Sequence, residues 1–214
     1  MAGILYLVPT PIGNLGDISL RAKQTLENAD FIAAEDTRVS LKLLNHLEIK
    51  KPLVSYYEHN KTFKGGRIVE RILAGETCAL VSDAGSPAIS DPGEDLVKEC
   101  AAAGITVCAI PGPCAAITAL SISGQSTGRF CFEGFLSMNK KERRERLAAL
   151  QTEERTMLFH EAPHKLRATL ADLRDAFGPD RRLSLCRELT KLHEETLRMT
   201  LGEAAAYYEV TEPK

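Results

Sequence analysis

Residues 79–93 read ALVSDAGSPAISDPG and contain, in order, an apolar run, a long loop of small residues and the predicted start of a helix. It begins with an apolar run, Ala79–Ser82, that is typical of a buried central strand. The loop that follows is longer than the usual strand-to-helix connection of roughly two to six residues. Its small side chains leave main-chain groups open to a ligand. Asp91 before Pro92 predicts the N-cap of the next helix.

The same order of strand, loop and helix recurs on both sides of this stretch. Short apolar runs predict further strands, and segments with helical spacing lie between them. Such alternation predicts a mostly parallel sheet that is covered by helices on both faces. The other predicted strands are Ile4–Val8, Phe31–Ala34, Leu53–Tyr57 and Ile105–Ile110, and the predicted helices are Ser19–Asn28, Thr37–His46, Thr62–Ala74 and Asp91–Ala103.

The pattern restarts after Pro111-Gly112-Pro113, where turn residues cluster. We therefore predict two α/β domains, residues 1–115 and residues 116–214. In the second domain the predicted helices are Cys114–Ser121, Lys140–Leu150, Pro163–Ala176 and Leu201–Tyr208, and the predicted strands are Arg129–Phe135, Thr156–His160, Arg182–Arg187 and Glu194–Met199.

Composition excludes several classes of protein. With 214 residues, 44% of them hydrophobic and 26% charged, the chain can bury a core and is not disordered as a whole. A net charge of −2 excludes a generally basic nucleic-acid binder, but not a local basic patch. Six cysteines without a CxxC pair indicate reduced thiols. Without a membrane-length apolar run or a signal peptide, we expect a soluble cytoplasmic protein.

Familiar catalytic motifs are missing from the sequence. It contains neither GxGxxG nor GxxxxGK[ST], so a dinucleotide dehydrogenase and a P-loop kinase lose their main support. It also lacks the GxSxG nucleophile elbow. His160 and His164 have a metal-like spacing, but Pro163 breaks the helix that would align them. We therefore expect no metal site.

Two more loops follow predicted strands of the first half, at residues 9–17 and at Pro111-Gly112-Pro113. The carboxyl ends of parallel strands meet at one edge of a sheet, so the three loops should build a narrow pocket for a flat, polar small molecule. Polar residues end other strands, at 35–38, 159–165 and 187–191. Each of these polar groups could equally be a helix cap.

Residues 139–146 carry five positive and two negative charges. A charge run of this kind is by default a solvated helix face. A local excess of positive charge in an acidic chain nevertheless suits phosphate groups. The candidate phosphate-binding residues are Lys140, Lys141, Arg143, Arg144 and Arg146.

Seven blocks in one order resemble the tetrapyrrole methylase superfamily and, within it, the ribosomal RNA small subunit methyltransferase I family. Together they span essentially the whole chain, and their combination is far more specific than any single block. The blocks are LVPTPIGNLGD (7–17), AAEDTR (33–38), VSDAGSPAISDPG (81–93), IPGPCAAITAL (110–120), FEGFL (132–136), FHEAPHKL (159–166) and CRELTKLHEE (186–195).

The resemblance implies a mostly parallel N-terminal sheet, a mixed-sheet C-terminal domain, and S-adenosyl-L-methionine bound in the cleft between the domains. It also implies a homodimer that methylates the ribose 2′-OH of a decoding-centre nucleotide, cytidine 1402 of 16S rRNA, in the small ribosomal subunit. The basic run would then contact RNA. Carried over residue by residue, the cofactor-binding positions are Pro11, Ala84, Gly85, Ser86, Pro87, Ile89, Ala115, Ala116, Phe132, Glu133 and Ala162.

The catalytic group is left open. A base that removes the proton from a ribose hydroxyl raises the reaction rate by roughly 10²–10⁴-fold. Basic side chains could equally hold the neighbouring phosphate. The candidates are Arg38, Glu161, His164, Arg187 and Lys191. Two other functions also stay open: methylation of a tetrapyrrole or other small molecule, and a non-catalytic ribosome-associated module without affinity for the cofactor.

The sequence departs from the family pattern at two places. Ser137-Met138-Asn139 stands where the family has proline and basic residues. The chain ends at Glu212-Pro213-Lys214, before the Gly-Glu and apolar strand with which family members continue. The resemblance therefore implies a fragment that lacks an edge strand and a small C-terminal domain.

Overall fold

The computed structural model describes residues 2–58 and 61–213. The chain forms two compact units, Met1–Ala115 (unit 1) and Ala116–Lys214 (unit 2). Each unit has its own sheet structure and its own apolar core.

Unit 1 contains a five-stranded sheet in the order β3-β2-β4-β1-β5, in which every neighbouring pair is parallel. The predicted parallel sheet is confirmed. Its strands are β1 (Ile4–Leu7), β2 (Phe31–Ala34), β3 (Leu53–Ser55), β4 (Cys78–Val81) and β5 (Thr106–Ala109), and its helices are α1 (Leu20–Asn28), α2 (Thr37–His46), α3 (Lys61–Leu73) and α4 (Gly93–Ala102), with a 3-10 turn η1 (Leu15–Asp17).

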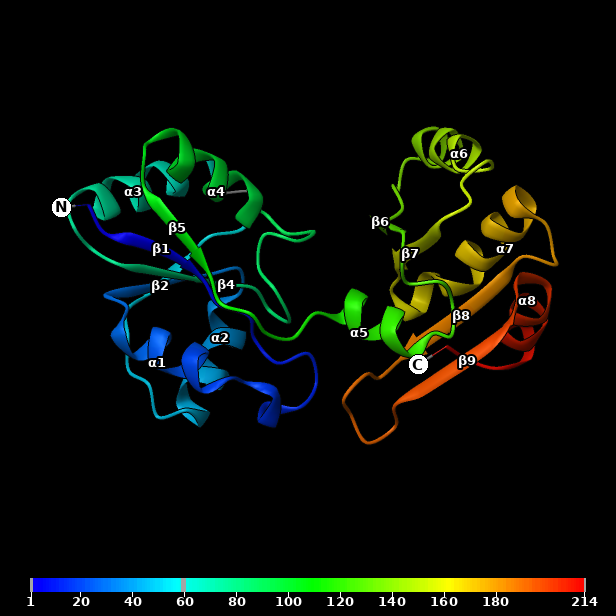
Figure 1. Ribbon diagram of the computed structural model, residues 1–214, viewed down its shortest axis with the longest axis horizontal. Helices are drawn as coiled ribbons and strands as arrows, with labels where there is room; N and C mark the ends of the chain where they lie inside the picture. The colour runs from blue at the N-terminus through cyan, green and yellow to red at the C-terminus, as the bar shows by residue number, and fades with distance from the viewer. Residues whose placement is uncertain (1, 59–60, 214) are drawn as a thin grey trace. The chain divides into compact units, whose positions relative to one another are not determined.

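Helices cover both faces of this sheet. In Figure 1, α3 and α4 lie on one face, and α1 and α2 lie on the other. Because side chains alternate along a strand, Phe31 and Ala33 enter the core under α3 and α4, whereas Ile32 and Ala34 enter the core under α1 and α2. β4 is buried along its whole length, as expected of the central strand.

The helices that follow β1 and β4 lie on opposite faces of the sheet. These strands are neighbours in the sheet, yet β1 leads into α1 on one face and β4 leads into α4 on the other. In open α/β sheets, such a switch point leaves a crevice outside the carboxyl ends of the two strands, where ligands bind. The loops after β1 and β4 are therefore the first place to look for a site.

Unit 2 contains two ladders of two strands each. β6 (Phe130–Phe135) pairs in parallel with β7 (Thr156–His160), and β8 (Arg182–Arg187) pairs antiparallel with β9 (Glu195–Thr200). The mixed strand directions are as expected, but within residues 116–213 they form two ladders, not one sheet. The helices are α5 (Ala115–Ile122), α6 (Lys140–Ala149), α7 (Leu166–Phe177) and α8 (Leu201–Val210), with a 3-10 turn η2 (Pro163–Lys165).

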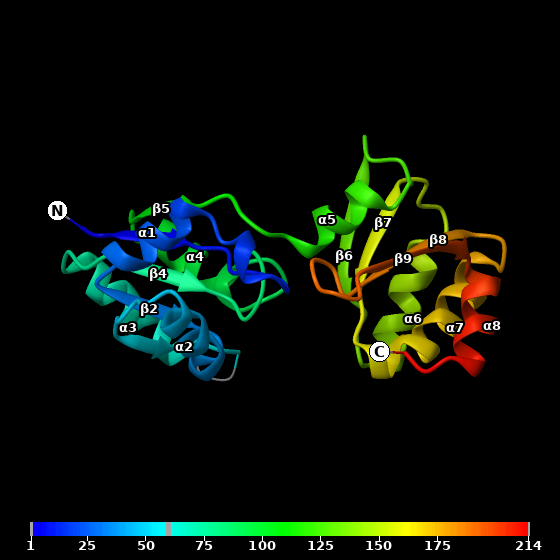
Figure 2. The same cartoon turned by 90° about the horizontal axis from the view of Figure 1, so that it is seen from below.

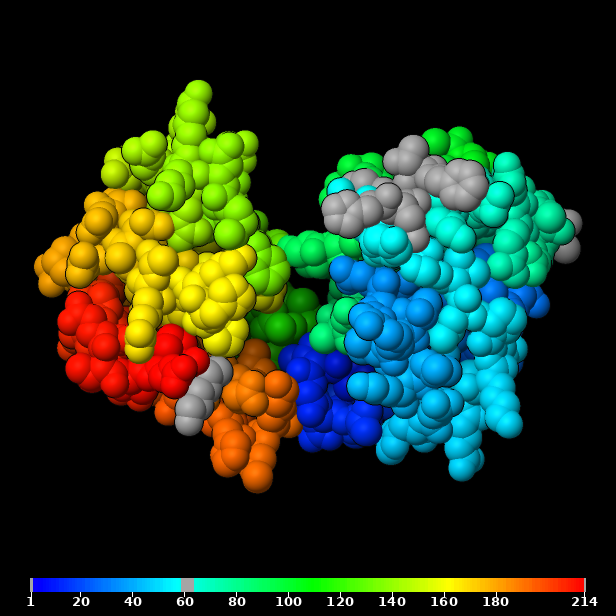
Figure 3. Space-filling model, turned by 180° about the vertical axis from the view of Figure 1, so that it is seen from behind, coloured from blue at the N-terminus to red at the C-terminus, as the bar shows by residue number. Residues whose placement is uncertain are grey.

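The core of unit 2 lies where α6, α7 and α8 pack together (Figure 2). Leu147, Leu170 and Leu201 contribute to it from the three helices in turn. Figure 3 shows α8, in red, against the yellow segment that holds the start of α7. There the Arg167 guanidinium donates to the carbonyl oxygen of Thr211 at 3.2 Å, which fixes the end of α8.

Two sequence predictions about helix starts were wrong. α4 begins at Gly93 with Pro92 at the N-cap, so Asp91 is one residue too early to cap it. The Asp91 carboxylate instead accepts hydrogen bonds from the main-chain N–H groups of Ala88 and Gly93. The segment that begins at Pro163 opens as the 3-10 turn η2 before α7.

The cysteines are reduced, as the sequence predicts. All six cysteines are free thiols, and those of Cys78 and Cys100 are buried. Burial raises the pKa of the Cys100 thiol to about 11. Across residues 2–58 and 61–213, no helix has the length and apolar character needed to cross a membrane.

Candidate functional site

The loops after β1 and β4 are joined by a short antiparallel bridge between Thr10 and Gly85. The Thr10 N–H donates to the Gly85 carbonyl at 2.9 Å, and the Gly85 N–H donates to the Thr10 carbonyl at 3.0 Å. The Thr10 hydroxyl also donates to the carbonyl of Ser82 at 3.1 Å. Two main-chain hydrogen bonds and one from a side-chain hydroxyl therefore hold these loops together.

The loop after β5 joins the other two. The Ser86 hydroxyl donates to the Pro113 carbonyl at 3.0 Å. Gly112 lies so close to Pro9 that a Cβ atom built on it would be 2.8 Å from the Pro9 Cβ. The structure thus brings together the three loops that the sequence placed at one edge of the sheet.

Gly85 occupies the centre of this arrangement. Its φ of +82° lies in the left-handed region that favours glycine. A Cβ atom there would lie 3.3 Å from Cγ2 of Ile12 and 3.6 Å from the carbonyl oxygen of Pro113. Glycine at this position thus lets the three loops meet closely, and we call the edge that they form around Gly85 the cradle.

The same loop contains two non-glycine residues with left-handed backbone. Ala88 has a φ of 66° and Ser90 a φ of 62°. Such conformations cost roughly 1–3 kcal/mol each, persist only when neighbouring groups hold them, and cluster at functional sites. Here the Asp91 carboxylate holds the turn, with 3.0 Å to the Ala88 nitrogen and 2.7 Å to the Gly93 nitrogen.

Carboxylates gather at this edge and make it electronegative. Burial raises the pKa of Glu35, and the nearby charges of Asp83, Asp91 and Asp36 raise it further. The Asp36 N–H donates to Oδ1 of Asp83 at 3.1 Å, which ties the loop after β2 to the loop after β4. Hydrogen bonds from Arg38 lower the pKa of Asp36 to about 2. A ligand with positive charge suits such an edge.

Aromatic side chains mark the end of β6 and β7 in unit 2. The His160 ring lies 5.4 Å from the ring of Phe132 and 5.4 Å from the ring of Phe135, measured between centroids. Burial lowers the pKa of His160. Phe132 keeps 38% of its surface exposed, so it offers an apolar face.

Sequence comparison places the chain among known proteins. Residues 4–205 match the model of a family described as Tetrapyrrole (Corrin/Porphyrin) Methylases. The chain belongs to the tetrapyrrole methylase family.

Similar curated proteins show to which branch of this family the chain belongs. A protein of Synechocystis named ribosomal RNA small subunit methyltransferase I is 52% identical over 212 residues, which are 99% of this chain and 76% of that protein. A protein of the same name from Pseudomonas aeruginosa is 51% identical over 94% of this chain and 72% of its own length. This tetrapyrrole methylase therefore belongs with the ribosomal RNA small subunit methyltransferase I proteins.

Solved structures agree on the fold of this tetrapyrrole methylase. A diphthine synthase is similar with a TM-score of 0.74 and 14% identity, over 99% of this chain and 86% of its own. A uroporphyrin-III-C-methyltransferase from Thermus thermophilus has a TM-score of 0.67 and 20% identity, over 99% and 91%. At such identities, the likeness concerns the fold alone.

Four of the five catalytic candidates in this tetrapyrrole methylase have side-chain partners. Arg38 pairs with Asp36 at 2.7 Å, Arg187 with Glu195 at 2.6 Å, and Lys191 with Glu188 at 2.9 Å. Glu161 accepts a short hydrogen bond from the hydroxyl of Thr169. His164 is exposed in η2 and makes no hydrogen bond or ion pair within the described chain.

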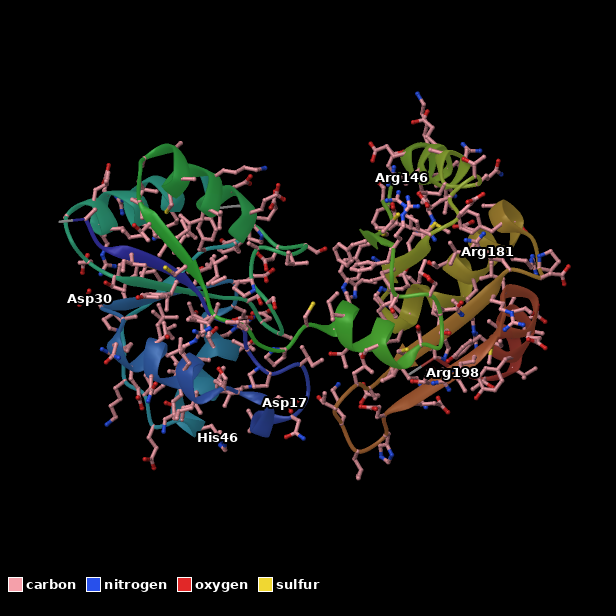
Figure 4. The ribbon with its side chains drawn as sticks, in the orientation of Figure 1. Asp17, Asp30, His46, Arg146, Arg181 and Arg198 are labelled. Atoms are coloured by element: carbon pink, nitrogen blue, oxygen red, sulfur yellow. The ribbon has the colours of Figure 1, made fainter. Side chains whose placement is uncertain are left out.

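The basic helix α6 divides into paired and unpaired charges. Arg143 donates to Asp172 at 2.6 Å and to Thr169 at 2.8 Å, and only 14% of its side chain is exposed. Figure 4 shows Arg146 pointing from α6 toward β6, where it pairs with Glu133 at 2.6 Å. Arg143 is thus a largely buried structural residue. Lys140, Lys141, Arg144 and Arg146 are exposed, but Arg146 is held by Glu133 and Lys141 lies 3.9 Å from Glu145.

The predicted cofactor residue Glu133 is placed by a β-bulge. The pairing of β6 with β7 shifts its register between Phe132 and Gly134, so Glu133 is the extra residue. Its side chain is 5% exposed and bound to Arg146, so its carboxylate is already engaged within unit 2. Ala162, another predicted cofactor residue, stands at the N-cap of η2.

Several residues of the site could not be found from the sequence. Thr10 bridges to Gly85, which no local motif predicts, and Asp91, expected to cap a helix, instead holds the loop after β4. Thr169 and Asp172 link α7 to the predicted residues Glu161 and Arg143. Within the described residues, no cluster of three or more histidine, cysteine, aspartate or glutamate side chains could hold a metal.

Proposed function

We propose that this chain transfers a methyl group from S-adenosyl-L-methionine to the ribose 2′-OH of a cytidine in 16S rRNA, cytidine 1402 of the small subunit. Relatives at about half identity carry the name ribosomal RNA small subunit methyltransferase I. The observation that carries the proposal is the cradle at Gly85, which lies between three joined loops at a topological switch point.

The residues at this edge fit the proposed methyl donor. We assign the contacts with the donor's amino-acid tail and adenosine to the loop beside the Thr10–Gly85 bridge, where Ala84 is exposed and Ser86 is half-buried. The carboxylates of Glu35 and Asp91 suit the positive charge of a sulfonium. The donor supplies an electrophilic methyl group, which leaves the protein to position both reactants.

The proposed role of the remaining residues follows from their partners. A base must accept the proton of the ribose hydroxyl, and His164 is the candidate whose side chain is exposed and has no partner in the described chain. Arg38, Arg187 and Lys191 are cations whose side chains stay 87%, 30% and 46% exposed beside their carboxylate partners, so we assign them to phosphate binding. Glu161 positions Ala162, whose N–H donates to it at 2.8 Å.

Two measurements test the proposed function. Calorimetry with S-adenosyl-L-methionine should show binding to the chain. Radioactive methyl groups should then appear on unmodified small ribosomal subunits, and mapping should place them on the ribose of one cytidine. Binding without transfer to subunits would contradict the RNA substrate, and a chain that binds no donor would contradict the enzyme altogether.

We further propose that the protein works as a cytoplasmic homodimer, by analogy with the family. Light scattering at micromolar concentration should give twice the 23.4 kDa mass of the chain. A single species at the mass of one chain would contradict the dimer.

A further inference from the structure

A cavity of about 260 Å³ lies in unit 1 next to the loops after β1 and β4. The start of each loop forms one side, through Thr10, Pro11 and Ser82, and α2 forms the other. The residues at the centre of the donor cradle, Gly85 and Ser86, are not part of its lining. The cavity therefore borders the proposed donor site without being the cradle itself.

One wall of the cavity contains a buried hydroxyl without a partner. Ser40 on α2 is 5% exposed, and its Oγ makes no hydrogen bond with any described residue. Its main-chain N–H is bound to the Asp36 carbonyl at 3.0 Å, so only the side chain is unsatisfied. Leaving a buried hydroxyl unpaired is costly, and a ligand could pair with it because it both donates and accepts.

The other walls combine apolar and polar groups. Leu15 and Val39 present apolar surface, Asp83 presents a carboxylate, and Lys42 and His46 supply basic groups. Figure 4 shows His46 at the surface of unit 1, near the end of α2. Apolar walls with a few fixed polar groups are the usual surroundings of a flat heterocycle. The volume is below the roughly 300–1,000 Å³ of sites for drug-sized ligands, so one small ring system fits.

The Asp83 carboxylate determines which heterocycle the cavity would prefer. Its Oδ1 accepts the Asp36 N–H, and a carboxylate can accept further hydrogen bonds. A carboxylate favours the exocyclic amine of cytosine and repels the carbonyl at the same position of uracil. We propose that this cavity binds the cytosine base of the acceptor nucleotide, turned out of its stack, with Asp83 accepting from the amine and Ser40 bonding to the ring edge. This inference rests on the proposed function.

Two variants test the inference by their effect on substrate choice. Asp83→Asn keeps an oxygen for the Asp36 N–H but offers an amide N–H, which suits uracil. The parent should prefer subunits with cytidine at the mapped position over subunits with uridine there, and Asp83→Asn should reduce that preference in kcat/KM by about tenfold. Ser40→Ala should raise KM for the subunits while the melting temperature stays equal or rises, because the unpaired hydroxyl is gone.

A matched control exists at the opposite edge of the same sheet. Asp30 precedes β2 and accepts the N–H of Thr77 at 2.7 Å, just as Asp83 follows β4 and accepts the N–H of Asp36. Asp30→Asn therefore repeats the chemical change away from the cavity. It should leave the cytidine preference and the KM for subunits as they are in the parent.

The outcomes separate this inference from the proposed function. An active parent whose preference and KM are the same in Asp83→Asn and Ser40→Ala would overturn the inference alone. A tenfold weaker binding of S-adenosyl-L-methionine in either variant would assign the cavity to the donor and also overturn it. A parent that transfers no methyl group to subunits would overturn the proposed function, and this inference with it.

Discussion

The strand-end loops of unit 1 and the basic helix of unit 2 present their functional groups in different ways. Around Gly85, the geometry is carried by main-chain bonds between loops and by small side chains. On α6, it depends on which charged side chains have partners, and Arg143 and Arg146 both do. A motif of small residues thus predicts the shape of the loops that contain it. A run of charged residues does not show which of them are free to bind a phosphate.

The largest effect should come from filling the cradle. Gly85→Leu places a side chain against Ile12 and the Pro113 carbonyl, so we expect binding of S-adenosyl-L-methionine to be lost. The left-handed backbone adds a stability cost of roughly 1–2 kcal/mol. Calorimetry measures the binding, and thermal unfolding measures the stability.

Gly104 provides the control for Gly85. It has a similar φ of +71°, but a Cβ atom there meets no atom within 4 Å. Gly104→Leu should therefore lose similar stability and keep donor binding. If a folded Gly85→Leu protein bound the donor as tightly as the parent, the cradle would not be part of the donor site.

The next effect separates structural from exposed charges on α6. Arg143→Gln breaks the contacts to Asp172 and Thr169, and hydrogen bonds of charged groups are worth about 1.5–3 kcal/mol. We expect a loss of about 2 kcal/mol in the free energy of unfolding. Arg144→Gln, one residue on, should change it by less than about 0.5 kcal/mol. Denaturant titrations of both variants check this, and equal stabilities would contradict the division of the helix.

The exposed charges should act on RNA binding and not on stability. Replacing Lys140, Lys141 and Arg144 by glutamine removes three charges, each worth roughly 0.7–0.9 in the salt-dependence slope if it neutralises a phosphate. The slope should flatten by about two to three units, while donor affinity stays the same. Binding of small subunits across a salt series measures it. Parallel slopes for parent and triple variant would make α6 a solvated surface.

The smallest effect concerns the Asp36–Arg38 pair. Hydrogen bonds from Arg38 hold the pKa of Asp36 at about 2. Because this pKa is lowered in the folded state, the pair stabilises the protein above the ordinary carboxyl pKa of about 3.9, and the contribution is lost as the pH falls toward 2. In Arg38→Gln, an NMR titration should show the Asp36 midpoint moving up toward the ordinary value. An unmoved midpoint would mean that other groups lower it.

The sequence was sufficient for the parts of the fold that depend on local patterns. β2, α2, β7 and β8 have the predicted bounds, because apolar periodicity and turn residues mark both ends of each. The meeting of the three loops followed from topology, since strand ends of a parallel sheet share an edge. The seven blocks gave the family, which the comparison confirmed.

The rest depends on pairs that are distant in the sequence. The helical positions of 140, 143 and 144 predict a shared basic face, but the partner of Arg143 is Asp172 on another helix. The bridge between Thr10 and Gly85 joins two loops that no local rule connects. The cavity beside Ser40 likewise needs α2 and both loops in place. Such contacts appear only once the tertiary structure is known.

The bridge between Thr10 and Gly85 also bears on the order of folding. Thr10 follows the first strand of the chain, whereas Gly85 follows the fourth, and β4 must dock between β1 and β2 before the two can meet. Contacts of such sequence separation form slowly, because a long loop has to close first. The third joined loop, at Pro111-Gly112-Pro113, is made last, so a chain emerging from the ribosome completes this edge only when its whole first unit has been made.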